Sequence, residues 1–170
     1  VNTRYRMFLQ TSLLQAFRVA PLLVLLLALI ATIPSLAATN WPPDLVTLVK
    51  TLQKAGYQVR FENPPVPGAY GATNVRKKII WVAPITVDLG IARQTLIHEA
   101  VHAAQGCPKG RLEPIGWNTD MVNAVDREVA GILYRNYSRS KFDVEREAFA
   151  MQGNPRAIEI VTSAIKRRCR

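Results

Sequence analysis

Residues 1–38 contain no acidic side chain, and Val19–Ala38 contain no charge of either sign. The missing polar face excludes an amphipathic surface helix, and a domain of this size cannot readily bury such a segment on every side. Three arginines precede the apolar run and small residues close it at Ser35–Ala38. The pattern predicts an export signal cleaved near residue 38. An uncleaved membrane anchor remains open, because about 18 uncharged residues can span a bilayer. Either way, residues 39–170 are expected to fold outside the cytoplasm (periplasm, lumen or extracellular space).

Acidic residues are also scarce downstream. Three of the 22 basic residues lie in the leader, which leaves 19 against 12 acidic residues after residue 38, a formal charge of +7. The basic residues are scattered apart from Lys166–Arg170, and no aromatic interleaving or nucleic-acid motif accompanies them. We therefore predict no nucleic-acid partner. Lysine and arginine in the last turn of a helix suit its dipole, and only a weak attraction to anionic surfaces is expected.

Cysteine is limited to Cys107 and Cys169. Neither has a second cysteine at the two-residue spacing of zinc sites, which disfavours a cysteine-based metal site. In an exported chain an even pair is consistent with one disulfide, which would close a loop of about 60 residues and contribute roughly 4 kcal/mol in the chain-entropy model. Two free, buried thiols are the alternative.

The remaining pattern predicts a helix, a small antiparallel sheet and then further helices, which is an α+β fold. Proline and glycine punctuate the segments and an Asn-Pro pair precedes the last helix. The first expected helix ends near Gly56. The next begins at Thr86 or Asp88 and ends at Gly106, and a third begins at Asn118 or Thr119. The expected elements are a helix from about 44 to 55, strands at 57–61, 70–73 and 79–83, and helices at 86–106, 118–135, 142–152 and from 155 onward.

Histidine occurs only twice, in the segment TLIHEAVHAAQ at residues 95–105. His98 and His102 are four residues apart, so on a helix both imidazoles lie on one face and can converge on a single ion. Glu99 is rotated by about 100° from His98 and flanks that face, where it can act as a general base on a metal-activated water. The surrounding residues are uncharged, and a buried carboxylate needs such a partner. The alternative is a helix whose two histidines are solvent-exposed or core residues and bind no metal.

The segment TLIHEAVHAA resembles the active-site helix of zincin-type zinc metallopeptidases. The resemblance implies a minimal zincin-like domain that binds Zn²⁺ through His98 and His102, with Glu99 as catalytic base. The metzincin pattern is excluded, because Pro108 stands where its third histidine would be. The third ligand must then be a carboxylate from a later helix, as in gluzincins.

The segment DVEREAFAMQ offers two candidate carboxylates. Val144, Glu147, Ala148 and Met151 recur at helical spacing, so Glu147 is predicted to face inward and to be the third ligand. The glutamate-alanine pair also resembles the gluzincin ligand helix. Glu145 points about 200° away from that stripe, and Glu128 is a rival on the preceding helix.

These residues predict an exported or membrane-tethered zinc peptidase that acts on a peptide or protein substrate. The substrate would pair with the edge of the hairpin at residues 70–83. Tyr134 and Tyr137 are candidate oxyanion stabilisers, although tyrosines at the end of an amphipathic helix more often serve packing. The alternatives are a non-catalytic, zinc-stabilised binding or assembly module of the envelope, and a membrane-anchored interaction protein without metal.

Overall fold

A computed structural model describes residues 42–117 and 120–170. The predicted leader and its cleavage site lie outside these residues, as do Asn118 and Thr119, the expected start of a helix. In the part of the chain that is described, no helix is long and apolar enough to cross a bilayer. The elements in chain order are α2 (Pro43–Lys54), β1 (Gln58–Arg60), β2 (Gly71–Asn74), β3 (Ile79–Val82), α3 (Ile85–Asp88), α4 (Ala92–Gly106), α5 (Asn123–Asn136), the short 3₁₀ helix η1 (Arg139–Lys141), α6 (Phe142–Gln152) and α7 (Ala157–Arg168).

The α+β class is confirmed, but the prediction of an antiparallel sheet is wrong. The three strands are ordered β1-β3-β2, with β2 antiparallel and β1 parallel to β3. The 71–82 hairpin is as expected, but the connection after β1 leads to β2 at the far edge of the sheet, so β3 lies between the two strands and pairs with β1 in parallel. This order leaves β2 at an edge of the sheet.

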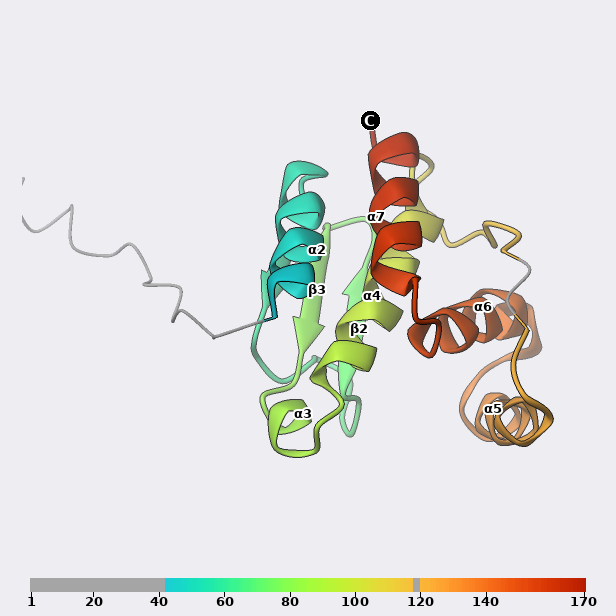
Figure 1. Cartoon of the computed structure of the whole chain (residues 1–170). Helices are drawn as coiled ribbons and strands as arrows, with labels where there is room; N and C mark the ends of the chain where they lie inside the picture. The colour runs from blue at the N-terminus through green and yellow to red at the C-terminus, as the bar shows by residue number, and fades with distance from the viewer. Residues whose placement is uncertain (1–41, 118–119) are drawn as a thin grey trace, which may run out of the picture. The chain divides into compact units, whose positions relative to one another are not determined.

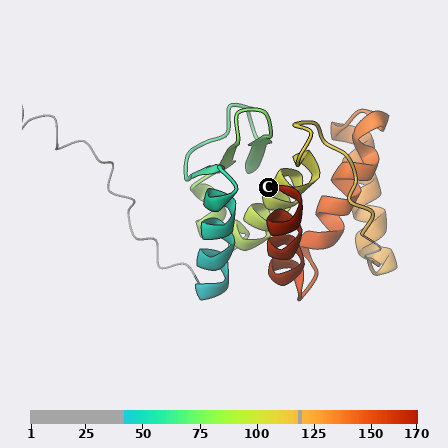
Figure 2. The same cartoon turned by 90° about the horizontal axis from the view of Figure 1, so that it is seen from above.

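The helices pack in layers beside this sheet (Figure 1). Helix α4 contacts β2 and β3, whereas α2 contacts β1 and α4. Helix α7 lies across α2 and α4, and α6 packs on α4 with α5 beyond it. Seen from above, α2 and α7 lie side by side, while α5 and α6 form the opposite side of the domain (Figure 2). Helix α4 is therefore central.

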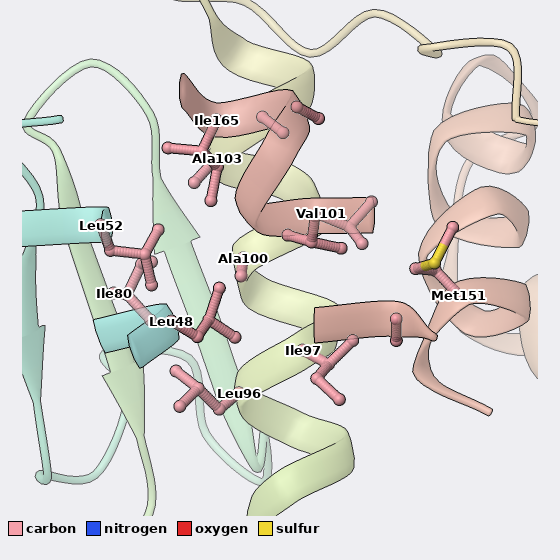
Figure 3. Close-up of a cluster of buried hydrophobic side chains, with 14 of the residues drawn as sticks. Leu48, Leu52, Ile80, Leu96, Ile97, Ala100, Val101, Ala103, Met151 and Ile165 are labelled. Carbon is pink, nitrogen blue, oxygen red and sulfur yellow. The ribbon is translucent and has the colours of Figure 1, made fainter. Parts of the chain in front are cut away.

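The core is built around α4 (Figure 3). Every residue from Leu96 to Cys107 is buried, which is why this helix lacks a polar face. Small residues such as Ala100 and Ala103 let neighbouring elements approach closely, and a side chain at Gly106 would collide with Val75. Because the interior is densely packed, the backbone that carries both histidines is held from all sides.

Helix boundaries differ from the expectation at three places, one of which is the start of α7 at Ala157 and not at residue 155. The predicted helix over residues 86–106 is broken into α3 and α4 at Gly90, whose φ of 68° belongs to the left-handed region. Helix α5 begins at Asn123, so Met121 and Val122 precede it instead of contributing to its apolar stripe. Helices α2 and α6 match the predicted segments closely.

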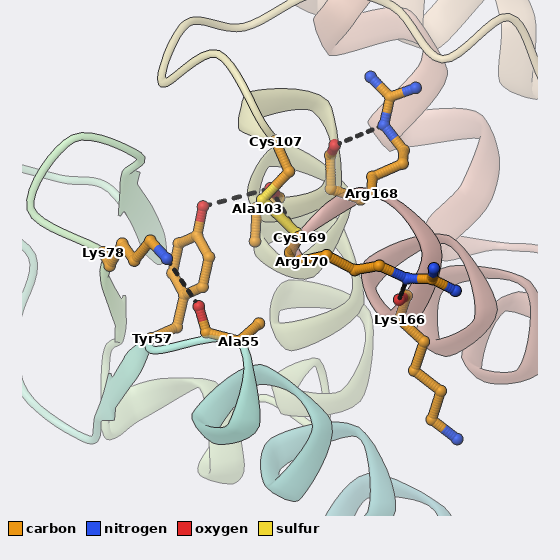
Figure 4. The surroundings of a disulfide bond; sticks show 10 residues. Ala55, Tyr57, Lys78, Ala103, Cys107, Lys166, Arg168, Cys169 and Arg170 are labelled. Atoms are coloured by element: carbon orange, nitrogen blue, oxygen red, sulfur yellow. Dashed lines mark hydrogen bonds between the residues drawn. A yellow bond between two sulfur atoms is a disulfide. The ribbon is translucent and has the colours of Figure 1, made fainter.

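The predicted disulfide is confirmed (Figure 4). Cys107 follows α4 and Cys169 follows α7; their Cα atoms are 5.0 Å apart, and the two residues are separated by 62 positions in sequence. Basic side chains bind helix carboxyl ends in the same region: Lys78 Nζ donates to the Ala55 carbonyl at 2.8 Å and Arg168 Nε to the Ala104 carbonyl at 3.0 Å. Lys166, Arg167 and Arg168 lie in the last turn of α7, where their charges suit the dipole of that helix as predicted.

Candidate metal centre and cleft

The two histidines of α4 converge as their spacing predicts. His98 Nε2 and His102 Nε2 lie 3.1 Å apart, and the exposed fractions of the two residues are 8% and 6%. Phe149 of α6 packs edge-on against His98, with ring centroids 4.7 Å apart. Two nitrogen lone pairs at such a distance repel, so a proton or a cation must lie between them.

Glu145 of α6 supplies a third donor. Its Oε2 lies 3.4 Å from His98 Nε2 and 3.3 Å from His102 Nε2. Burial alone would lower the pKa of His102, but Glu145, helped by the charge of Glu99 and by Gln105, raises it to about 9. Burial alone would raise the pKa of Glu145, but the two imidazoles lower it to about 2. The carboxylate is therefore ionised at neutral pH.

The three donor atoms fit a small divalent cation. Bond lengths of about 2.0–2.1 Å and a tetrahedral angle place the donors of a zinc ion about 3.3–3.4 Å apart. The three donor atoms are 3.1, 3.3 and 3.4 Å apart. Glu145 Oε2 is buried and makes no hydrogen bond in the described part of the chain; its neighbours are the two imidazoles, and a bound cation would replace the His102 proton that faces it. His98, His102 and Glu145 thus form a buried group that could bind a metal.

The prediction that Glu147 faces the histidines is wrong. Its carboxylate accepts hydrogen bonds from the backbone N–H groups of residues 115–117 at 2.7–2.9 Å and from Gln105 Nε2 at 2.8 Å. The rival Glu128 is exposed on α5. Glu147 is buried as predicted, but amide donors and not a metal compensate its charge.

The error comes from treating α6 as a helix with one buried face. Helix α6 lies between α4 and α5, so two of its faces are covered. Glu145, Ala148, Phe149 and Gln152 form a second stripe at positions i, i+3, i+4 and i+7. In that stripe Phe149 stands four positions after Glu145, and this spacing was the sequence signal for a second buried face of α6.

Glu99, the predicted base, is buried beside the metal group. Thr73 of β2 donates a hydrogen bond to Glu99 Oε2 at 2.7 Å, which ties the carboxylate to the edge strand. Gly71 lies so close that a Cβ there would stand 2.6 Å from Glu99 Oε1. The absence of a side chain at Gly71 therefore makes room for the carboxylate.

His98 and Glu99 line a cavity of about 750 Å³. Its walls come from the 66–71 segment leading into β2, from α4, from the end of α5, and from Phe149 and Gln152 of α6. Tyr137 also lines it. Burial, followed by the negative charges of Glu145 and Glu99, raises the pKa of Tyr137 to about 12, so its hydroxyl stays protonated and can donate. Tyr134 does not reach the cavity lining: it is 70% exposed and packs against Phe142.

A family model described as a domain of unknown function, DUF8637, matches residues 74–170, more than half of the chain. The chain belongs to the DUF8637 family. The DUF8637 match includes His98, His102 and Glu145, but begins at the last residue of β2. No curated protein and no solved structure matches the chain.

Proposed function

We propose that this DUF8637 protein is a zinc-dependent peptidase. The observation that carries the proposal is the triangle of donors from His98, His102 and Glu145, with Glu99 next to it on the wall of the cavity. Two imidazoles and one carboxylate are a donor set that zinc favours in catalytic sites, and such a set leaves a fourth position free. A purely structural zinc site would have four protein ligands and no need for Glu99.

Zinc in this group would polarise a peptide carbonyl and lower the pKa of a water molecule toward 7. Glu99 would accept a proton from that water and return it to the departing amine nitrogen. Thr73 would orient Glu99, since its hydroxyl already donates to one carboxylate oxygen. The protonated hydroxyl of Tyr137 would donate a hydrogen bond to the developing oxyanion, since Tyr137 lies on the cavity wall.

An extended peptide would lie along β2. This strand is at the edge of the sheet, and Tyr70 and Gly71 at its start belong to the cavity wall. Backbone groups on the outer edge of such a strand can pair with a substrate strand, which positions a scissile bond near His98 and Glu99. Export or membrane tethering rests on residues 1–38, and the disulfide agrees with an oxidising compartment.

The test combines metal analysis with cleavage of an unfolded protein. The purified chain is expected to bind one equivalent of zinc and to cleave. Glu99→Gln is expected to keep the zinc and to lose activity by about 10²–10⁴-fold, the usual contribution of a general base. Glu128→Gln is the matched control, because that glutamate is exposed on α5 and should change neither property.

The outcomes separate the candidate functions. Stoichiometric zinc without cleavage of any unfolded protein would favour a non-catalytic binding or assembly module of the envelope. Failure to bind zinc would exclude both the peptidase and that module. Equal activity of Glu99→Gln and the native chain would reject Glu99 as the base.

A further inference from the structure

Gln105 lies one turn after His102 and is almost fully buried, with 1% of its surface exposed. Its Nε2 donates to the Val144 carbonyl at 2.9 Å and to Glu147 Oε2 at 2.8 Å. Both partners can only accept, because one is a backbone carbonyl and the other a carboxylate. These two contacts decide which end of the amide is nitrogen, and they direct Gln105 Oε1 toward His102.

The orientation of this amide decides the tautomer of His102. Gln105 Oε1 lies 2.7 Å from His102 Nδ1, and an amide oxygen can only accept, so Nδ1 must carry a proton. A neutral imidazole protonated at Nδ1 has its free lone pair on Nε2. Nε2 is the atom that faces His98 and Glu145. Gln105 therefore presents His102 in the form that a metal requires.

Glu147 in turn fixes Gln105. Its two oxygens accept three consecutive backbone N–H groups, from Ile115, Gly116 and Trp117, in addition to the Gln105 amide. Four donors hold the carboxylate in place. A chain of hydrogen bonds thus runs from the loop after α4, through Glu147 and Gln105, to His102, and every polar group in it has a partner.

We propose that Gln105 and Glu147 are positioning residues for the metal ligand His102. The pair fixes the Nδ1-protonated tautomer and the ring orientation, and it couples metal affinity to the order of residues 115–117. This inference rests on the metal group of the proposed function but needs no catalysis. Partners of this kind, which orient a metal-bound histidine through its other ring nitrogen, typically change metal affinity by 10–100-fold when they are removed.

The experiment measures the zinc dissociation constant of the full chain by competition with a chelator. Gln105→Met keeps a long unbranched side chain but has no amide, and is expected to weaken zinc binding by about 10–100-fold. Gln53→Met is the matched control and should bind like the native chain, because Gln53 is exposed on α2. Glu147→Gln should also weaken binding, because an amide cannot accept hydrogen bonds at both of its ends. The double variant should be no weaker than Gln105→Met alone, since both changes break one chain of contacts.

A second readout uses the native chain, so it is independent of whether the variants fold. Long-range ¹H–¹⁵N correlation of the zinc-loaded protein should show the His102 proton on Nδ1 and the metal on Nε2. A proton on Nε2, or an unchanged dissociation constant in a folded Gln105→Met variant, would overturn the proposal. Zinc binding with the expected losses but without peptide cleavage would leave it standing and would reject only the peptidase.

Discussion

Gly71→Ala gives the sharpest test of how the cleft holds Glu99. A Cβ at this position would lie 2.6 Å from Glu99 Oε1, 2.8 Å from Glu99 Cγ and 2.8 Å from Thr95 Cγ2. Ordinary contact begins at 3.4 Å, so the carboxylate oxygen must move away by 3.4 minus 2.6, or about 0.8 Å. The movement would strain the hydrogen bond from Thr73, which holds the other carboxylate oxygen.

A misplacement of about 1 Å in a reacting group costs on the order of 10²-fold in rate. We therefore expect Gly71→Ala to lower kcat by roughly 10²-fold on an unfolded protein substrate. The zinc content should not change, because neither Gly71 nor Glu99 belongs to the donor triangle. The assay is cleavage rate beside metal analysis of the same sample, with a thermal melt to show that the fold is intact.

Gly153→Ala is the matched control. Among the described residues, no atom beyond its two chain neighbours lies within 4 Å of a Cβ built at Gly153, and its φ of −91° suits any residue. This variant should keep the native kcat. A Gly71→Ala protein that is folded, zinc-loaded and fully active would refute the reasoning, because the position of Glu99 would then not matter to the reaction.

Three further predictions concern the metal group and the disulfide. Glu145→Gln should lower zinc affinity by more than Glu147→Gln does, because Glu145 contacts both imidazoles and Glu147 does not. Chelator competition measures both affinities, and the reverse order would favour Glu147 as the third ligand. Replacing Cys107 and Cys169 together by alanine should lower the free energy of unfolding in urea by roughly 4 kcal/mol, the chain-entropy value for a loop of this length, and a loss below about 1 kcal/mol would contradict that account. In the metal-free chain the pKa of His102 is raised from 6.5 to about 9, so its stabilising contribution is complete below pH 6.5 and is lost as the pH rises through 9. Urea unfolding at pH 6 and pH 9.5 measures this loss, and equal stability at the two values would contradict the His102–Glu145 pairing.

Local patterns were sufficient for much of the fold. Periodicity placed α2 and α6, although it revealed only one of the two covered faces of α6. The turn between two short strands placed the hairpin. The order of the strands was not accessible in the same way. Parallel pairing of β1 with β3 arises because the 61–70 connection leads to β2 at the far edge of the sheet, and no side-chain period records that path.

The candidate site also contains residues that local pattern locates and residues that it does not. His98, Glu99 and His102 could be located because all three lie within one turn or so of a single helix. The third donor depends on which face of α6 meets α4. The helical wheel ranked Glu147 first because it lies among apolar residues, but its charge is satisfied by backbone amides of a loop whose course the sequence does not reveal. Long-range contacts, and not local pattern, distinguish the two glutamates.

The burial of α4 along its whole second half has a consequence for protein engineering. Residues that would normally be exchanged to raise thermal tolerance in a helix are solvent-facing ones, and between Leu96 and Cys107 there are none. Any attempt to make the protein more heat-resistant should therefore start on α5 or on the exposed side of α2. Random mutagenesis, for the same reason, should return inactive clones from α4 more often than from any neighbouring helix of comparable length.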